Sequence, residues 1–314
     1  MSKGHLVTGG AGFIGSNLVR RLAGLGERVR VFDNLSSGHL DNLRGLESAV
    51  EFVQGDLRDS AAVREAVRGM SYVFHAGALA SVQASVEDPA TTHEVNLTGT
   101  LNVLRAARDA GVERVVFSSS ASVYGDSPEM PKREDMRPAP LTGYALSKLA
   151  SEHYGQIFHG LYGLNFFALR YFNVFGPRQD PSSHYAAVVP LFIRAYAAGR
   201  QPTIYGDGGQ TRDFTYVEDI VSANMMCLSA PAEAAGSAYN VAYGDRVSVR
   251  ELAAQIAALA GQPFAPVFAP ARAGDIRESQ ADSSRARRVL GWNPEHTFAS
   301  GLRSTYDWFA SRVR

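Results

Sequence analysis

A tyrosine and a lysine stand four residues apart in the segment "LTGYALSKLASEHY", which spans residues 141–154. Positions i and i+4 share one face of a helix, so Lys148 can lie beside Tyr144. An unperturbed tyrosine has a pKa of about 10, and a nearby cation favours its phenolate form. A phenolate at neutral pH is a competent general base for the proton of a hydroxyl group. The spacing therefore predicts chemistry on an alcohol.

A serine run, "FSSSASVYG", lies shortly before this pair, and Ser120 closes the predicted strand "RVVFSSS". Open α/β sheets bind their ligands at the carboxyl ends of strands, so the Ser120 hydroxyl can share or relay the proton. Tyr-x-x-x-Lys alone is common on protein surfaces, and a serine at a strand end is usually a cap. Their ordered combination with a nucleotide-binding turn is what points to a site.

The segment "TGGAGFIGSNL" follows the first predicted strand and opens the first predicted helix. Gly9 and Gly12 permit a tight turn with close backbone approach, Gly15 lets helix and strand pack, and a pyrophosphate can bind the helix N-terminus. Gly10 also fits the glycine pattern. Asp33 ends the second strand, where a carboxylate accepts hydrogen bonds from the adenosine ribose and repels a 2′-phosphate. The following "NLSSG" holds no arginine, so we expect NAD and not NADP. A helix cap or turn residue is the alternative for Asp33.

Two further segments follow predicted strands. Asp56, in "GDLRD", is placed to bind the adenine amino group, with a helix N-cap as the equally plausible alternative. "HAGA", at 75–78, keeps side chains small where the nucleotide would lie. His75 has no partner at a spacing typical of metal ligands, so we interpret it as a packed or surface histidine.

The elements that must position these residues alternate as βαβα up to about residue 172. Strands such as "RVVFSSS" are apolar enough for burial on both faces, and helices with a 3.6-residue period separate them. This predicts a Rossmann-type doubly wound parallel sheet of the α/β class. We expect an NAD-binding domain at 1–172, rejoined by about 211–230, and a smaller α/β domain, mainly for the substrate, at 173–314. The strand "AYNVA" is assigned to that second domain.

Composition excludes several classes of function. The 314 residues hold 31 Lys plus Arg and 31 Asp plus Glu, so no global field attracts nucleic acid or anionic membranes. The single cysteine, Cys227, permits no internal disulfide. No apolar run approaches the roughly 20 residues of a membrane-spanning helix, and no secretory signal opens the chain. We expect a cytoplasmic protein without a membrane or nucleic-acid partner.

These motifs together resemble the extended short-chain dehydrogenase/reductase family, and within it the UDP-sugar 4-epimerases. The resemblance runs from "LVTGGAGFIG" to "RRVLGW" and also includes "DNLSSG", "YALSK", "RYFNVFGPRQ", "YGDGGQTRDFTYVED" and "ARAGD". It implies a tightly bound NAD, a UDP-sugar substrate, no metal and a homodimer paired through the helices at 91–110 and 144–160. Ordinary surface amphipathicity is the alternative for those helices.

The resemblance implies a role for each matching residue. Tyr144 would be the base, Lys148 its electrostatic partner and a ribose contact, and Ser120 a second hydroxyl at the sugar oxygen. For each arginine a surface ion pair is the alternative. The implied cofactor residues are Gly9, Gly12, Phe13, Ile14, Gly15, Asp33, Asn34, Ser37, Gly38, Asp56, Leu57, His75, Ala76, Ala78, Asn96, Ser118, Tyr144, Lys148 and Phe172. The implied substrate residues are Ser120, Ser122, Tyr144, Asn173, Val189, Tyr205, Arg212, Arg272, Asp275 and Ser279.

Four positions differ from those of related enzymes and bear on the expected reaction. Related 4,6-dehydratases carry an Asp-Glu pair where this chain has Ala121 and Ser122. Because alanine cannot move a proton, this position argues against dehydration. Epimerases restricted to plain hexoses resemble this chain but carry a tyrosine where it has Ser279, so we expect room for an N-acetyl group. Gly143 departs from the proline that the family usually has before the tyrosine, which loosens that loop.

Other functions remain open at this point. A UDP-glucuronate 4-epimerase or decarboxylase would need a cation near the sugar C6, and the sequence does not decide whether Arg178 or Arg277 reaches it. A nucleotide-sugar reductase would use the same scaffold. A non-catalytic nucleotide-sensing protein typically loses the tyrosine or the lysine, and this chain keeps both.

Overall fold

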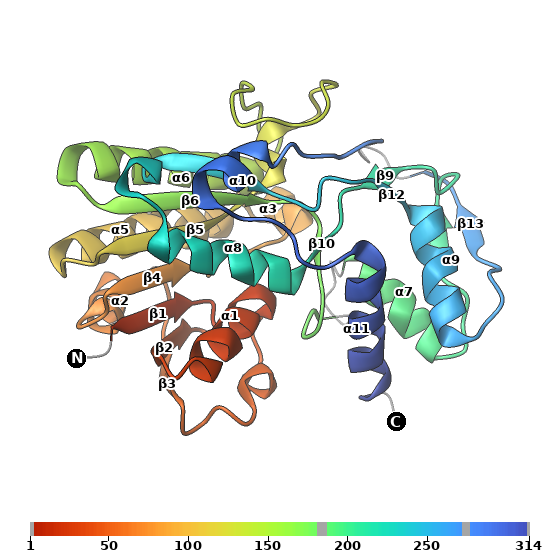
Figure 1. The fold of residues 1–314 in the computed structure, drawn as a ribbon, viewed down its shortest axis with the longest axis horizontal. Coiled ribbons are helices and arrows are strands. Elements are labelled where there is room, and N and C mark those ends of the chain that lie inside the picture. The colour runs from red at the N-terminus through yellow and green to blue at the C-terminus, as the bar shows by residue number, and fades with distance from the viewer. Residues whose placement is uncertain (1–2, 181–186, 272–276, 313–314) are drawn as a thin grey trace.

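A parallel sheet of seven strands forms the centre of the computed structural model, which describes residues 3–180, 187–271 and 277–312 (Figure 1). The strand order is β11-β6-β5-β4-β1-β2-β3, with every neighbouring pair parallel. The order reverses between β1 and β4, which opens a crevice at the carboxyl edge of the sheet. The predicted doubly wound sheet is therefore confirmed. The strands are β1 (Gly4–Thr8), β2 (Arg28–Asp33), β3 (Val50–Gln54), β4 (Tyr72–His75), β5 (Arg114–Ser120), β6 (Asn165–Tyr171) and β11 (Ser237–Val241).

Helices cover both faces of this sheet, and each face has its own hydrophobic core. Leu18 and Ile220 belong to the core beneath α1, α8 and α10, whereas Val103 and Phe158 belong to the core beneath α2, α5 and α6. Burial on both faces explains why the strands are almost continuously apolar. These helices are α1 (Phe13–Gly24), α2 (Ser60–Val67), α5 (Gly99–Asp109), α6 (Gly143–Tyr162), α8 (Val217–Ser229) and α10 (Ser284–Leu290).

A third core lies beside the sheet, where α7, α9 and α11 pack together on the right of Figure 1. Short strand pairs, β7 with β10, β9 with β12 and β8 with β13, connect these helices. The bounds are α7 (Val188–Ala197), α9 (Val249–Ala260), α11 (Phe298–Ala310), β7 (Val174–Phe175), β8 (Thr203–Tyr205), β9 (Thr211–Arg212), β10 (Thr215–Tyr216), β12 (Val247–Ser248) and β13 (Val267–Ala269).

Shorter helical turns connect the larger elements. The long helix expected near 91–110 is divided by a π-helical turn at Glu94–Thr98. The remaining elements are α3 (Val82–Glu87), α4 (Pro89–His93) and the 3-10 turns η1 (Leu40–Leu43), η3 (Ala121–Tyr124) and η4 (Ala232–Ala234). A search of the described helices finds none with the length and apolarity to cross a lipid bilayer.

The placement of "AYNVA" in the second domain is wrong. These residues belong to β11, which extends the central sheet by pairing with β6, so that Asn240 lies opposite Arg170. Tyr239 and Val241 are fully buried there, which is the reason the strand is so apolar. Of the segment expected to return at about 211–230, α8 packs on the central sheet, whereas β10 pairs with β7 outside it. The division of function between 1–172 and 173–314 stays a prediction.

Candidate active site

A hollow lies at the carboxyl edge of β1, β2 and β4, where the strand order reverses. Most residues predicted for the cofactor line it. They are Gly9, Gly12, Phe13, Ile14, Gly15, Asp33, Asn34, Ser37, Gly38, Asp56, Leu57, Ala76 and Ala78. The sequence analysis missed Phe32, Ser36, Gly55, Gly77, Leu79, Ala80 and Val95, which also line it. They flank the predicted positions, and no polar pattern marks them.

The glycines of the first turn are there because larger side chains do not fit. Gly9 has a φ of 67°, and a Cβ on Gly15 would lie 2.1 Å from the Gly9 carbonyl oxygen. The turn therefore brings the start of α1 against the strand end. No side chain caps α1 at Gly12, so the backbone N–H groups of its first turn remain available to an anion. This geometry fits the pyrophosphate of a dinucleotide.

Two carboxylates border the hollow. Asp33 accepts hydrogen bonds from the backbone N–H of Ala11 at 3.0 Å and of Leu35 at 2.8 Å. A carboxylate has about four acceptor positions, so Asp33 retains capacity for ribose hydroxyl groups. Asp56 pairs with Arg58 at 2.8 Å, and the pKa of Asp56 is held well below its usual range by that hydrogen bond. It is not the N-cap of α2, because Asp59 holds that position.

His75 and Asn96 lie behind the hollow and do not line it. The ring nitrogens of His75 lie 2.7 Å from the Thr8 hydroxyl and 2.9 Å from that of Thr100, and burial lowers the pKa of the ring to about 3. Of the packed and surface positions left open by the sequence, His75 takes the packed one, and it does not line the hollow as the resemblance implied. Asn96 holds the backbone of Leu79 through bonds of 2.8 and 3.1 Å, so its side chain supports the wall of the hollow.

The helix that carries the tyrosine begins where the sequence predicts. α6 starts at Gly143, and the Thr142 hydroxyl accepts a hydrogen bond from the Ala145 backbone. Glycine in place of proline is thus compatible with a capped first turn. Lys148 is buried, donates to the Ser118 carbonyl oxygen at 2.8 Å and lies 5.8 Å from the centre of the Tyr144 ring. One helix face therefore holds both groups beside the end of β5.

The ionisation of this pair differs from the sequence-based expectation. Burial raises the pKa of Tyr144, and a hydrogen bond with Ser120 opposes the rise only in part. Burial also lowers the pKa of Lys148 to about 8, while the charge of Glu152 opposes that change. Both groups lose hydration in the same enclosed niche, so the lysine alone does not make Tyr144 a phenolate. A further positive charge beside the ring, such as an oxidised nicotinamide, would favour ionisation.

A second pocket adjoins Ser120 and collects residues predicted for the substrate. It is lined by Ser120, Ala121, Ser122, Gly125, Lys132, Tyr171, Phe172, Asn173, Arg212, Glu278 and Ser279. The Ser120 hydroxyl also accepts from the Ser122 backbone at 3.1 Å, which fixes the turn after β5. Phe172, predicted for the cofactor, lies here. Arg272 and Asp275 lie outside the described residues.

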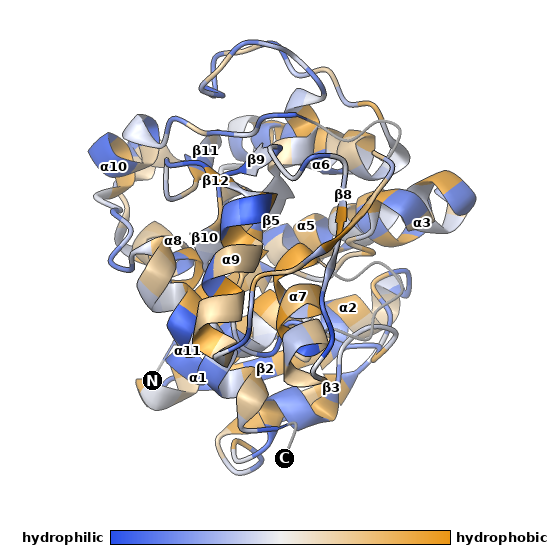
Figure 2. Ribbon diagram, turned by 90° about the vertical axis from the view of Figure 1, so that its right-hand side faces the viewer, coloured by the Kyte–Doolittle hydropathy of each residue, from blue (hydrophilic) through white to orange (hydrophobic). Residues whose placement is uncertain are grey.

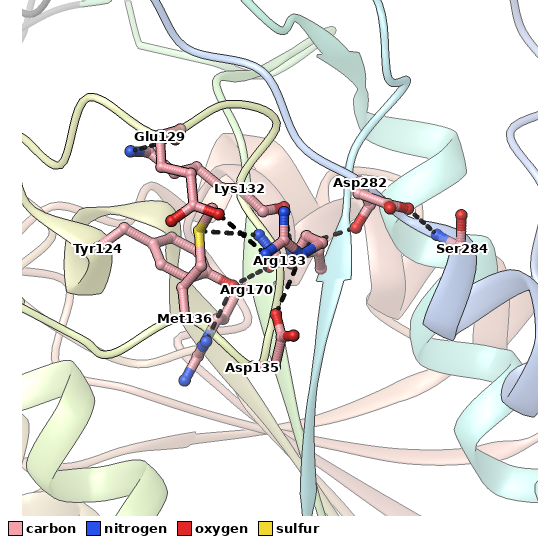
Figure 3. Close-up of polar contacts among 10 residues, drawn as sticks. Tyr124, Glu129, Lys132, Arg133, Asp135, Met136, Arg170, Asp282 and Ser284 are labelled. Atoms are coloured by element: carbon pink, nitrogen blue, oxygen red, sulfur yellow. Dashed lines mark hydrogen bonds and ion pairs between the residues drawn. The ribbon is translucent and has the colours of Figure 1, made fainter.

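Lys132 is a member of this pocket that sequence reasoning missed. Its backbone pairs with the segment that carries Ser279, through bonds of 2.8 Å to the Gln280 carbonyl and 2.9 Å from the Asp282 N–H. Its ammonium group donates to the carbonyl oxygens of Ser127 and Glu129. Figure 3 shows this loop beside the segment of Asp282, which leads into α10 at Ser284. In the sequence Lys132 is one charge in the stretch "MPKRED", and no periodicity distinguishes it.

Asp213 supports the same wall from the other side. It is fully buried and accepts hydrogen bonds from the backbone of Gly244 and Ala281 at 3.1 Å. Burial raises the pKa of its carboxyl group to about 7. Ala281 follows Ser279 by two residues, so Asp213 positions the segment that carries Ser279.

A buried ion pair lies beside Lys148 on α6. Glu152, one turn after Lys148 on α6, accepts from two guanidinium nitrogens of Arg170 at 3.0 and 2.6 Å and from the Ser119 hydroxyl. Arg170 also donates to the Tyr124 hydroxyl at 2.9 Å, and both residues appear in Figure 3. The pair joins α6 to β5 and β6 behind the site.

Four other predicted residues are placed elsewhere. Val189 is buried in the third hydrophobic core, and Tyr205 lies on β8 outside both pockets. Arg277 pairs with Asp207 at 2.9 Å on the surface, and Arg178 lines two different cavities. Neither arginine lines the pocket of Ser279, so the cation of a uronate-specific enzyme is not supplied by them.

Comparison with known proteins gives a consistent result. The sequence profile of the NAD dependent epimerase/dehydratase family matches residues 5–242. The chain is 43% identical to a UDP-glucose 4-epimerase of Mycolicibacterium smegmatis over 98% of both chains. It also resembles the solved UDP-N-acetylglucosamine 4-epimerase of Methanobrevibacter ruminantium in complex with UDP-N-acetylmuramic acid (TM-score 0.94, 39% identity, 99% of each chain). A UDP-glucose 4-epimerase of Thermus thermophilus in complex with NAD gives a TM-score of 0.87 at 40% identity over 98% of each chain.

Proposed function

The chain belongs to the NAD dependent epimerase/dehydratase family, and we propose that it is an NAD-dependent 4-epimerase of UDP-sugars. One observation carries this proposal. Tyr144, Lys148 and Ser120 lie together at the carboxyl end of β5, and Ser120 lines the pocket that also holds Ser279. The residue after Ser120 is alanine, so the acid that dehydration would require is missing from that position.

The residues of the chain divide the reaction between binding and proton transfer. The glycine turn and Asp33 hold the nucleotide, which supplies a reversible acceptor of hydride when bound. Tyr144 takes the proton from the sugar 4-hydroxyl, with Ser120 hydrogen-bonded to the same oxygen. It returns the proton after the 4-keto sugar has rotated within the pocket to present its other face. Because the cofactor is regenerated in each cycle, it can stay bound. Lys148, whose ammonium group lies 5.8 Å from the centre of the Tyr144 ring, adds a positive charge on the same face of α6.

The second pocket would hold the UDP-sugar. Arg212 lines it, and a guanidinium group pairs well with phosphate oxygens. Asn173 has a φ of 28°, and its side chain donates to the Asp213 carbonyl oxygen at 3.3 Å. With this strained backbone, Asn173 lines the pocket together with Ser279. Arg272 and Asp275 remain proposed contacts to the diphosphate and the uridine ribose.

The direct test uses the protein as purified. We expect UDP-glucose and UDP-N-acetylglucosamine to be converted to their 4-epimers without added cofactor, as followed by NMR. An absorbance spectrum of the same sample would show the bound nicotinamide. A 4-keto or 6-deoxy sugar as the sole product would contradict the proposal, because it would indicate dehydration.

Ser279 should decide whether N-acetylated sugars are accepted. It lines the pocket beside Ser122 and Asn173, and its small side chain leaves space at the wall. Changing Ser279→Tyr should reduce kcat/KM for UDP-N-acetylglucosamine by about tenfold or more, since a clash of this kind costs at least ~1–3 kcal/mol. Activity on UDP-glucose should be largely retained.

Ser279→Ala is the matched control for this experiment, because it removes the hydroxyl without filling the space. It should leave the preference between the two sugars almost unchanged. An equal loss of both activities in Ser279→Tyr would show that the position does not control the size of the sugar.

We also propose that two copies pair through α3, α5 and α6. The outer face of α6 exposes four apolar side chains at helical spacing: Leu146, Tyr154, Ile157 and Leu161. The opposite face of α6 is buried against the sheet, so these four are not needed for the core. Figure 2 shows apolar residues on the protruding helix α3. An apolar stripe of this kind typically marks an interface. The free, buried Cys227 fits a reducing compartment, and we propose the cytoplasm as the location.

Changing Ile157→Glu should convert this dimer to a monomer. Ile157 is 50% exposed in the single chain, and a two-fold axis would place two new carboxylates in one apolar interface. The molar mass by light scattering should fall by half. Leu25→Glu is the control, because Leu25 is 52% exposed at the end of α1, away from the stripe. Equal masses for both variants would contradict the proposed interface.

A further inference from the structure

Two neighbouring cavities lie away from the proposed cofactor and sugar pockets, and Arg20 and Arg178 line both of them. The larger one has a volume of about 560 Å³ and lies between α1 and α11, which are neighbours in Figures 1 and 2. That volume lies within the range of small-molecule sites, roughly 300–1,000 Å³. Trp308, from α11, and Arg312, just beyond the end of that helix, complete its wall together with His39 and Asn42.

Three arginines at this place lack a carboxylate partner. Within the described residues, no ion pair is formed by Arg20, Arg178 or Arg312. Arg20 donates to the carbonyl oxygens of Asn42 and Arg44 at 2.8–3.1 Å. Arg312 donates to the Trp308 carbonyl at 3.3 Å and lies 4.0 Å from the centre of the Trp308 ring. Neutral carbonyl groups satisfy hydrogen bonds without cancelling the positive charge.

Arg178 is the most constrained of the three. Its backbone has a φ of 70°, a value that residues other than glycine rarely adopt. One terminal nitrogen donates to the Asn17 side chain, whereas its Nε is buried and has no partner. An unpaired buried donor is costly, and a ligand oxygen would satisfy it.

Mutual repulsion acts on this group. Burial, followed by the charges of Arg20 and Arg312, lowers the pKa of Arg178 to about 10, and Glu218 opposes this weakly. The pKa of Arg20 is lowered by burial and by Arg312, with Glu47 acting in the opposite direction. One guanidinium group bound to carbonyl oxygens would be enough to hold the loop after β2. Three guanidinium groups that repel one another are not required for that purpose. An anion would remove the repulsion.

We propose that Arg20, Arg178 and Arg312 form a binding site for a small molecule that carries a di- or triphosphate group. Three guanidinium groups match the charge of such a group, and their planar forks bind phosphate oxygens in pairs. Most of the acids that line the cavities pair with other residues, since Glu218 and Asp219 lie 3.4 and 2.9 Å from His296. Asp41 pairs with Arg44 at 2.8 Å, and Asp180 lies 3.5 Å from His39.

The site shares a wall with the cofactor hollow. Ser36, Ser37 and Gly38 line the hollow, while His39 and Asn42, a few residues on, line the arginine cavity. Both His39 and Asn42 donate to the Ala11 carbonyl oxygen, at 3.0 and 2.9 Å, and the Ala11 N–H binds Asp33. An anion bound by Arg20, which already donates to the Asn42 carbonyl oxygen, would therefore be coupled to the adenosine side of the cofactor hollow. This coupling rests on the proposed function, whereas the anion site itself does not.

Calorimetry with inorganic tripolyphosphate tests the site on the purified holoprotein. Saturating UDP is added first so that the sugar-nucleotide pocket is filled. We expect one molecule to bind per chain, and Arg178→Gln and Arg312→Gln each to weaken binding by about tenfold, as for loss of a charged hydrogen bond. Arg64→Gln, on the opposite face of the sheet, should bind as the unchanged protein does. Because no turnover is measured, the result does not depend on epimerase activity.

Thermal unfolding distinguishes a structural role for the arginines. If they only hold loops, Arg178→Gln should lower the melting temperature while tripolyphosphate still binds with the original affinity, and that result would overturn the proposal. Arg312 lies exposed beyond the end of α11, so Arg312→Gln should fold even where the other variant does not. If both variants fold and both bind tripolyphosphate as tightly as the unchanged protein, the proposal is overturned. If only Arg312→Gln folds, unchanged binding in that variant overturns it.

Discussion

Replacing Tyr144 with phenylalanine is expected to lower kcat for 4-epimerisation by about 10²–10⁴-fold, which is the usual contribution of a general base. The variant removes one oxygen from a half-buried ring at the start of α6 and leaves the packing of that ring intact. The bound nicotinamide should remain, because the glycine turn and Asp33 are untouched. Rates would be measured by NMR on UDP-glucose.

Tyr162→Phe is the matched control for this result. Tyr162 closes the same helix, 51% exposed and far from Ser120 in the sequence, so losing its hydroxyl should change kcat little. The pH dependence gives a second check. Since burial raises the pKa of Tyr144, the active phenolate forms more readily as pH rises, and the activity should increase toward alkaline pH. Full activity in Tyr144→Phe would refute the proposed chemistry.

Replacing Glu152 with alanine should produce the largest loss of stability. Glu152 is 1% and Arg170 4% exposed, so the change leaves a buried guanidinium group without its counter-ion. Removing one partner of such a pair typically costs about 3–5 kcal/mol. The free energy of unfolding would be measured by urea denaturation, followed by circular dichroism at neutral pH.

Two further variants serve as controls for this loss of stability. Glu152→Gln keeps the volume and one acceptor for Arg170, so it should be less damaging than alanine. Glu113→Ala breaks an exposed pair with Lys3 and should have little effect. If Glu152→Ala unfolds at the same urea concentration as Glu113→Ala, the pair does not stabilise the fold. The loss of Glu152 should also lower the pKa of Lys148 further, because its charge opposes the effect of burial.

The parts of the site that the sequence predicts are those whose geometry is local. The tyrosine–lysine pair needs only the pitch of one helix, and the glycine turn needs only a strand, a loop and a helix start. Asp33 follows because the strand end fixes its place. Each of these features lies within a short stretch of sequence that the sheet then brings to one edge.

The parts that could not be predicted depend on contacts between distant segments. Arg170 and Glu152 come from β6 and α6, while Asp213 binds a segment almost 70 residues further along the chain. Lys132 is an ordinary loop charge until it pairs beside Ser279. The sequence predicts a lowered pKa for Tyr144, whereas the structure raises it. The difference arises because burial depends on the whole fold and not on the spacing of two residues.

The late arrival of β11 has a consequence for synthesis. A nascent chain that has reached residue 172 already contains β1 to β6, but β6 has a free edge until residues 237–241 leave the ribosome. α8 and α10, which cover one face of the sheet, are also made after that point. An apolar strand edge that stays open during translation is a template for aggregation. We therefore expect a chain truncated near residue 172 to aggregate more readily than the full chain, because its sheet keeps one edge and one face uncovered.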